Sequence, residues 1–285
     1  MAIDPQKALG AEIPGGPSSW DRDQVILYHL GVGAGVPPTD TNELAYAYEK
    51  NLKVLPSFGV IPVFRSLGAI GGVPGLAGAF NPALLLHGEQ DIVLHEPIPV
   101  EATASSKGRV AALYDKGKAA VAVMELDTTD ASGKKLFTNR FTLFLRGAGG
   151  FGGDRGPDVK IEPPARAPDL VKESPTLPQQ ALLYRLCGDK NPLHADPDFA
   201  KLGGFDKPIL HGLCSYGIVC KAVVDAACAG DVKHVARWQA RFAGVVFPGE
   251  TLVTSMWREG KTIFVAAKTR ERDTPVLSNA ALTLR

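Results

Sequence analysis

The sequence has no excess of charge of either sign, and this excludes several classes of partner. Its 285 residues include 31 basic and 30 acidic residues, which gives a net charge of +1. A chain with this balance has no general electrostatic attraction to nucleic acid or to an anionic membrane, so we expect neither as a partner. Any anionic ligand must be held by a local pocket. With 45% hydrophobic and 21% charged residues, the composition is that of a folded globular protein.

The sequence also lacks the cysteine pattern of a zinc site or of a disulfide framework. It contains no C-x-x-C pair, and no histidine alternates with its cysteines. The four cysteines are Cys187, Cys214, Cys220 and Cys228. We expect them to be reduced thiols in the interior.

Long uninterrupted apolar runs are missing too. The most apolar stretch, residues 212–230, is interrupted by Lys221 and Asp225, which predicts a core helix and no membrane span. Residues 1–7 have neither the basic flank nor the apolar run of a signal peptide, and residues 283–285 are not a Ser-Lys-Leu signal. We therefore expect a cytoplasmic enzyme or binding protein.

The chain contains the same plan twice. Three pairs of similar segments occur in the same order in both halves. They are residues 26–30 with 182–186, residues 57–61 with 215–219, and residues 99–101 with 248–250. The offset between partners is 156, then 158, then 149, so the first half has extra residues between its second and third segments. The small apolar stretch 68–78 is the expected place for them.

Glycine and proline mark the boundary between the halves. Residues 147–178 hold six Gly and six Pro, a density that neither helix nor sheet tolerates. We therefore expect a first repeat at residues 1–146, a linker at residues 147–175 and a second repeat at residues 176–285.

Two helices precede four strands in the second half. Thr176 and Gln179 have the form of a capping box, which predicts a helix over residues 177–187, and a longer helix is expected over residues 212–229. Alternating runs then predict strands over residues 237–246, 251–257, 262–267 and 277–284. This order indicates an α+β fold. We expect each half to wrap its sheet around a long helix, and the two halves to pair edge to edge.

One short stretch gathers the residue types that acid–base chemistry needs. Asp189, Asn191 and His194 lie within six residues, and Pro192 stiffens the turn. A carboxylate, a carboxamide and an imidazole that converge can activate one water molecule. Asp189 and Asn191 could instead merely cap a turn. The corresponding first-half segment, residues 31–35, follows a similar helix but has no such polar side chains, which favours chemistry.

A second signal lies where the longer helix begins. Residues 208–213 lead directly into it, and amides at a helix start are free to donate hydrogen bonds. Gly212 lets a ligand approach these amides closely, so it is a candidate for binding a carbonyl oxygen or an oxyanion. His211 could also be only a capping residue at this entry.

Two glycine-rich segments invite a nucleotide-binding interpretation that we reject. Residues 31–35 are followed by Pro37-Pro38 and not by a helix, and residues 149–156 lack the Lys-Ser/Thr of a phosphate loop. Both are interpreted as turns.

The motifs of both halves resemble the MaoC-like, (R)-specific 2-enoyl-CoA hydratase family, also called hydratase 2. In the second half the similar residues are 184–197, 199–200, 204–205, 208–213 and 241–243. In the first half they are residues 28–34, 85–90 and 115–117. The resemblance implies a double hot-dog fold, in which the second repeat keeps the chemistry and the first has become a shelf for the acyl chain. The extra stretch 68–78 would then leave room for chains longer than four carbons.

The resemblance also implies roles for single residues. Asp189 and His194 would be the catalytic pair, Asn191 would support them, and Gly212 would donate its amide to the thioester oxygen. The residues expected to bind the coenzyme A thioester are His87, Gly88, Lys116, Lys190, Pro192, Leu193, His211 and Phe242. No metal is expected, because Asp189, Asn191 and His194 would need a further His or Cys at a fixed spacing and none is evident. No separate cofactor is expected either, because coenzyme A is part of the substrate. A stand-alone enzyme that forms a homodimer is expected.

The expected reaction is the reversible syn hydration of a trans-2-enoyl-CoA to a (3R)-3-hydroxyacyl-CoA, with one water held between Asp189 and His194. Two alternatives stay open. The chain could be a dehydratase that acts on a (3R)-hydroxyacyl chain carried by acyl carrier protein, or a non-catalytic module that binds acyl thioesters.

Overall fold

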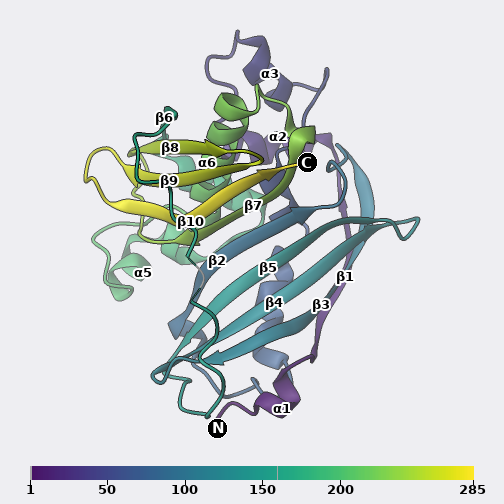
Figure 1. Ribbon diagram of the computed structural model, residues 1–285, viewed down its shortest axis with the longest axis vertical. Coiled ribbons are helices and arrows are strands. Elements are labelled where there is room, and N and C mark those ends of the chain that lie inside the picture. Colours follow the sequence, from purple (N-terminus) through teal and green to yellow (C-terminus); the bar gives the residue numbers. More distant parts are fainter. Residues whose placement is uncertain (1, 159) are drawn as a thin grey trace.

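A single antiparallel sheet of ten strands runs through the protein, in a computed structural model that describes residues 2–158 and 160–285 (Figure 1). The strand order is β1-β3-β4-β5-β2-β7-β10-β9-β8-β6. The first-half strands are β1 (Glu12–Trp20), β2 (Leu85–Leu94), β3 (Ala102–Asp115), β4 (Ala119–Asp130) and β5 (Lys135–Arg146). The second-half strands are β6 (Leu170–Pro175), β7 (Val235–Phe242), β8 (Thr251–Glu259), β9 (Thr262–Thr269) and β10 (Pro275–Leu284).

The two halves meet at the centre of this sheet, where β2 pairs with β7. Glu89 lies opposite Arg241, and Val93 lies opposite Arg237. Ion pairs cross the junction, from Arg241 to Glu89 at 2.6 Å and from Arg237 to Asp91 at 2.8 Å. The strand order on one side of this pair mirrors the order on the other, so the halves are related by an approximate two-fold axis. The prediction that the halves pair edge to edge is confirmed.

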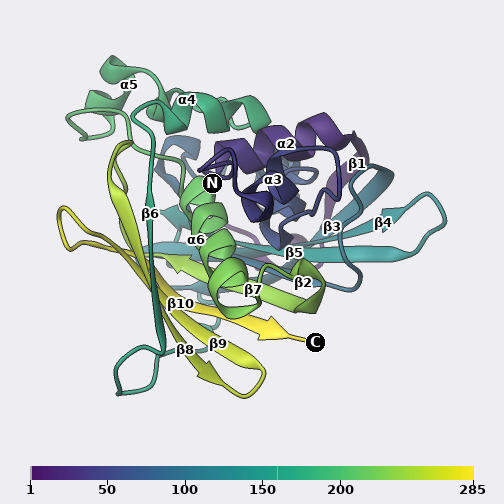
Figure 2. The same ribbon diagram turned by 90° about the horizontal axis from the view of Figure 1, so that it is seen from above.

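Helices cover one face of the sheet (Figure 2). They are α1 (Pro5–Ala8), α2 (Arg22–Gly31), α3 (Thr41–Ala47), α4 (Gln180–Tyr184), α5 (Pro197–Leu202) and α6 (Gly212–Ala227). Helix α6 lies against the strands of the second half, and α2 and α4 meet near its N-terminal end. The predicted long helix over residues 212–229 is confirmed, because this apolar run is buried on most sides of α6.

The first half has no long helix that matches α6 among its described residues, so the prediction of one long helix in each half is wrong. The corresponding chain forms 3-10 turns, η1 (Pro56–Val60) and η2 (Phe64–Gly72), and then η3 (Pro82–Leu84). Pro62 has no amide proton to donate, and the glycines of this stretch disfavour an α-helix. The turns nevertheless pack tightly on the sheet, since a Cβ on Gly59 would lie 2.4 Å from Cδ1 of Ile92.

The extra stretch 68–78 has free space beside some of its glycines and none beside Gly75. The Asp4 amide donates to the Gly75 carbonyl at 3.0 Å, and a Cβ on Gly75 would lie 2.4 Å from the Asp4 oxygen. A Cβ on Gly68, Gly71 or Gly72 would have no described atom within 4 Å. The segment at Gly75 therefore serves to dock the N-terminal helix α1 and leaves no room there for an acyl chain.

Two local predictions at the start of the second half need correction. Residues 170–175, expected in the linker, form β6, which pairs with β8 as β1 pairs with β3. Thr176 does not cap a helix, since its hydroxyl donates to the Glu250 carbonyl at 2.7 Å and accepts from the Gly249 amide at 2.9 Å. Helix α4 begins at Gln180 and continues as η4 (Arg185–Cys187), so the helical segment still ends where it was expected.

The cysteines have the predicted state. All four are free thiols, with Cys187 half-buried and the other three buried. Burial raises the pKa of the Cys228 thiol to about 11, so this group is protonated at neutral pH. Among the described residues, no helix is both long and apolar enough to cross a bilayer.

Candidate active site

The loop between η4 and α5 holds the predicted polar residues, and local hydrogen bonds set its shape. Asp189 Oδ1 accepts from the Asn191 amide at 3.1 Å, and Asn191 Oδ1 accepts from the Leu193 amide at 3.0 Å. These two acceptors lead into the short helix η5 (Pro192–His194). Asp189 and Asn191 therefore do cap the turn, as the alternative interpretation of this motif requires. The second carboxylate oxygen of Asp189 takes no part in the turn and is available for chemistry.

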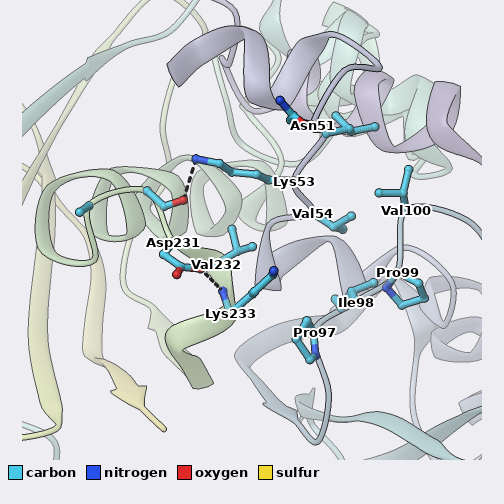
Figure 3. Close-up of a pocket in the computed structure, with 13 residues that line it drawn as sticks. Asn51, Lys53, Val54, Pro97, Ile98, Pro99, Val100, Asp231, Val232 and Lys233 are labelled. Carbon is cyan, nitrogen blue, oxygen red and sulfur yellow. Dashed lines mark hydrogen bonds between the residues drawn. The ribbon is translucent and has the colours of Figure 1, made fainter. Parts of the chain in front are cut away.

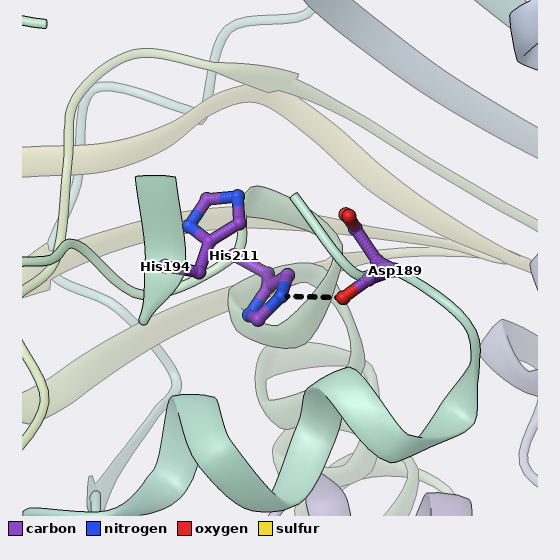
Figure 4. Close-up of side chains that lie close together, drawn as sticks. All are labelled: Asp189, His194 and His211. Atoms are coloured by element: carbon purple, nitrogen blue, oxygen red, sulfur yellow. Dashed lines mark hydrogen bonds between the residues drawn. The ribbon is translucent and has the colours of Figure 1, made fainter. Parts of the chain in front are cut away.

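Asp189, His194 and His211 converge beside the N-terminal end of α6 (Figure 4). One carboxylate oxygen and one nitrogen of each imidazole lie within 4.8 Å of one another. The two imidazoles stack, with ring centroids 3.8 Å apart and an angle of 31° between their planes. Polar atoms at such a separation can both contact one water molecule, because each hydrogen bond spans about 2.8 Å. The structure thus brings the predicted pair within reach of a single water.

The main chain sets the tautomer of His194. Its Nδ1 lies 2.8 Å from the Ile209 carbonyl oxygen, which can only accept, so Nδ1 carries the proton and Nε2 keeps its lone pair. Burial lowers the pKa of His194 below its usual value, although the Ile209 hydrogen bond and the Asp189 charge act in the opposite direction. His194 is therefore a neutral imidazole near pH 7, with Nε2 as a proton acceptor.

His211 supports this pair from the buried side. It is 1% exposed, and its Nε2 lies 3.2 Å from the carbonyl oxygen of Asp189, to which it donates. Its Nδ1 has no hydrogen-bond partner in the part of the chain that the structure describes. Burial and the neighbouring His194 lower the pKa of His211 to about 3, so the ring is neutral. The contacts of His211 hold the Asp189 main chain and the His194 ring in place.

Gly212, Phe242 and His87 form a second group at the same end of α6. Gly212 is exposed, and its amide donates no hydrogen bond within the described residues. A Cβ on Gly212 would lie 3.2 Å from two carbons of the Phe242 ring, whose centroid is 5.0 Å from that of His87. Gly88 follows His87 at a register shift between β2 and β5. The first half therefore contributes β2 residues next to the free amide of the second half.

The ring of His87 is uncharged. It packs between Phe141 and Phe242, and its Nε2 lies 3.0 Å from the Glu89 carbonyl oxygen. Burial lowers the pKa of His87 to about 4. The positive charge for a phosphate-bearing ligand must therefore come from other residues.

Lys116 lies apart from both groups. It is in the turn between β3 and β4, and the strand order puts it three strands from β2, or about 14 Å at the usual strand spacing. The neighbouring Asp115 carboxylate accepts from the amides of Gly117, Gly150 and Gly152 at 2.8–2.9 Å. These bonds tie the Lys116 turn to the glycine-rich segment 149–156, which is a loop as predicted. Only an extended ligand could touch both Lys116 and Gly212.

The remaining predicted residues lie on the catalytic loop itself. Lys190 and Pro192 are exposed, and Leu193 is half-buried. Two contributors were not predicted from the sequence, the Ile209 carbonyl and the Tyr184 ring, whose centroid is 5.0 Å from that of His211. A carbonyl is common to all residues and leaves no trace in the sequence. The binding roles of the predicted residues stay predictions.

The Asp189, His194 and His211 group also has the donor atoms of a metal site. From the sequence, no further histidine with a suitable spacing was evident, and the fold supplies one in His211. Each imidazole has one nitrogen held by a main-chain carbonyl, so each can offer only the other. Catalysis without a metal stays a prediction.

Comparison with known proteins divides the chain into two family domains. Residues 18–147 match the MFE-2 hydratase 2 N-terminal domain, and residues 160–280 match the MaoC-like domain. The enoyl-CoA hydratase ChsH3 of Mycobacterium tuberculosis is 44% identical over 97% of both chains. The peroxisomal enoyl-CoA hydratase 2 of Arabidopsis thaliana is 42% identical over 95% of this chain and 92% of its own. The crystal structure of a MaoC-like dehydratase from Phytophthora capsici superposes with a TM-score of 0.87 at 30% identity and covers 99% of both chains.

Proposed function

We propose that this chain, which belongs to the MaoC-like, hydratase 2 family and has its double hot-dog fold, catalyses the reversible hydration of trans-2-enoyl-CoA to (3R)-3-hydroxyacyl-CoA. The observation that carries the proposal is the convergence of Asp189 and His194 on one water position beside the free Gly212 amide. Relatives named as enoyl-CoA hydratases support the substrate class. The first half contributes the shelf for the thioester, and the second half contributes the chemistry.

In this mechanism Asp189 and His194 both contact the water from one side of the substrate. One member of the Asp189–His194 pair accepts a proton from the water as its oxygen bonds to C3. The pair then delivers this proton to C2, so it holds the same number of protons before and after turnover. Because both groups stand on the same face of the double bond, the addition is syn. The same steps in reverse dehydrate the 3-hydroxyacyl thioester.

The Gly212 amide stabilises the charge that develops on the thioester oxygen during the addition. It is the first amide of α6, where the helix dipole also favours negative charge. A single donor of this kind is worth roughly 3–4 kcal/mol of transition-state stabilisation in other enzymes. The Phe242 ring, 3.2 Å from a Cβ placed on Gly212, leaves space for a ligand only because residue 212 has no side chain.

The geometry of the site bears differently on the two alternative functions that the sequence leaves open. A non-catalytic binding module would have no use for an acceptor nitrogen on His194 and a free carboxylate oxygen on Asp189 at one water position. A carrier protein in place of coenzyme A would use the same pair, so it is separated by comparing rates on crotonyl-CoA and on crotonyl-acyl carrier protein. We propose coenzyme A as the carrier, and we expect the higher kcat/KM with crotonyl-CoA.

Location and assembly are further proposals. We propose a cytoplasmic location and a homodimeric assembly, while the Arabidopsis thaliana relative is named as peroxisomal. Light scattering coupled to gel filtration measures the mass of the assembly, and a mass of one chain would contradict the dimer.

The lowered pKa of His194 predicts the acid limb of the pH profile. Its ordinary pKa is about 6.5, and burial moves it down, so the neutral ring persists below pH 6.5. Protonation of Nε2 removes the acceptor for the proton of water, and kcat/KM for crotonyl-CoA should then fall. We therefore expect the acid limb below pH 6.5, measured in buffers of constant ionic strength. An acid limb above pH 6.5 would contradict the assignment.

Lys116 provides a test of the shelf. We expect Lys116→Ala to raise KM for crotonyl-CoA with little change in kcat, because a distant cation contacts ground state and transition state alike. Lys118→Ala is the matched control, since Lys118 is an exposed lysine of the same turn. A loss of kcat at unchanged KM in Lys116→Ala, or an equal rise of KM in the control, would remove the proposed role.

A further inference from the structure

A cavity lies at the opposite end of α6 from the catalytic loop. Its volume is about 640 Å³, and it is lined by residues 51–54, 97–100 and 229–233 (Figure 3). Helix α6 has 16 residues and therefore extends about 24 Å between the catalytic end and this cavity. A small molecule bound here does not reach the catalytic pair.

The internal repeat relates this cavity to the catalytic site. Residues 51–59 align with residues 209–217 without a gap, and four positions are identical between them. The identical pairs are Leu52 with Leu210, Leu55 with Leu213, Ser57 with Ser215, and Gly59 with Gly217. In this alignment Lys53 stands where the second half has His211, and Val54 stands where it has Gly212. The cavity is thus the first-half counterpart of the active-site entrance, without its acid–base residues.

Two lysines give this cavity a positive charge. Lys53 Nζ donates to the Gly230 carbonyl oxygen at 2.9 Å, and its ammonium has two further protons to donate. Lys233, which belongs to residues 229–233 of the lining, supplies a second ammonium. Asp231 is the one acidic residue among the described residues that line the cavity, and its Oδ1 accepts from the Lys233 amide at 2.9 Å. Two cations therefore stand against one carboxylate.

The rest of the lining is largely apolar. Figure 3 shows Ile98, Pro99 and Val100 on the side away from Lys53 and Lys233. The Trp20 indole donates to the Pro99 carbonyl oxygen at 2.9 Å and so holds this wall against β1. A cavity of a few hundred Å³ with an apolar wall and a few placed charges suits a small ligand with an apolar body and an anionic end.

We propose that this cavity binds a monocarboxylate with a medium-length apolar chain, at a site separate from the active site. A single negative charge fits better than a phosphate for two reasons. The cavity lies beyond the C-terminal end of α6, where the helix dipole disfavours an anion in proportion to its charge. No arginine is among its described lining residues, and arginine is the side chain that forms bidentate hydrogen bonds with phosphate. Because the described lining residues include no histidine and no counterpart of the Asp189–His194 pair, the ligand is bound and not converted.

Calorimetric titration of the full chain with decanoate tests this site, with coenzyme A present to occupy the active site. We expect one decanoate site, with decanol and inorganic phosphate binding at least tenfold more weakly. Lys53→Met should lower decanoate affinity at least tenfold, because a charge-assisted hydrogen bond is lost. Lys50→Met, which removes an exposed lysine outside the cavity, should leave it unchanged.

Equal affinities for decanoate and decanol, or for decanoate and phosphate, would overturn the proposal, as would an unchanged affinity in Lys53→Met. If Lys53→Met does not fold, Lys233→Glu decides, since Lys233 is exposed and its charge reversal should also weaken decanoate at least tenfold. Crotonyl-CoA hydration by Lys233→Glu should stay within twofold of the unaltered chain. A larger change would contradict the separation of the two sites.

Discussion

Asp189→Asn and His194→Ala should each lower kcat for crotonyl-CoA hydration by about 10²–10⁴-fold, the usual contribution of a general acid or base. Asn cannot exchange a proton at the position of the Asp189 carboxylate, and Ala removes the only nitrogen of His194 that is not held by the Ile209 carbonyl. Steady-state rates at saturating substrate measure the effect. The double variant should be little slower than the slower single variant, because both groups act on one water.

Asp196→Asn is the matched control for these variants. Asp196 lies in the same loop and accepts from the amides of Asp198 and Phe199 at the start of α5, a capping role that Asn also performs. We expect its kcat to be close to that of the unaltered chain, and all variants to keep their thermal midpoint within a few degrees. Near-normal turnover by Asp189→Asn or His194→Ala would remove the pair from the mechanism.

Lys221→Met should lower the free energy of unfolding by about 3–5 kcal/mol, because it leaves two mostly buried carboxylates without their cation. Lys221 Nζ contacts Glu43 Oε1 at 2.6 Å and Asp225 Oδ2 at 2.8 Å, and the three side chains are 11%, 15% and 25% exposed. Tyr46 donates to the other oxygen of Asp225 at 2.8 Å. This cluster joins α3 of the first half to α6 of the second. Denaturant titration monitored by circular dichroism measures the loss.

Lys201→Met is the control for this cluster. Lys201 pairs with Asp198 at 3.5 Å, but both side chains are largely exposed to solvent, and such surface pairs contribute little to stability. We expect no measurable change in the unfolding midpoint of this variant. A loss below about 1 kcal/mol in Lys221→Met would show that the buried cluster does not stabilise the junction of the halves.

Much of the second half was predictable because its patterns are local. The apolar run after His211 and the alternating runs after residue 235 predict α6 and the last four strands close to their observed ends. The repeat itself predicts that the two halves pair, since two similar units with open edge strands can share one sheet. The first and last residues of these elements differ by only a few positions from the predicted bounds.

The errors arose where tertiary contacts outweigh local patterns. Thr176 has the spacing of a helix cap, yet a partner 74 residues away, the Glu250 carbonyl, takes its hydroxyl. Residues 170–175 are mostly exposed and carry no alternation, so their pairing with β8 as an edge strand left no pattern in the sequence. In the first half the similarity of residues 57–61 to residues 215–219 suggested a second long helix, and the prolines and glycines around them prevented it.

The candidate site was likewise predictable where it depends on local motifs, and unpredictable where it depends on tertiary contacts. Asp189, Asn191, His194 and Gly212 were identified from two short motifs, and the fold places the first three in one loop and Gly212 beside them. The stacking of His211 on His194 requires two segments 17 residues apart to meet, and the Ile209 contact is to main chain. Neither can be seen in the sequence, although the Ile209 contact sets the tautomer on which the acceptor nitrogen of His194 depends.

The most direct test of hydration by the Asp189–His194 pair is the product formed from crotonyl-CoA in deuterated water. The account predicts (3R)-3-hydroxybutyryl-CoA with one deuterium at C2, added to the same face as the hydroxyl group, and an initial rate of product formation about 10²–10⁴-fold lower from Asp189→Asn. Chiral chromatography gives the configuration at C3, and proton coupling constants give the relative configuration at C2. A (3S) product, anti addition, or an equal initial rate from Asp189→Asn would contradict it.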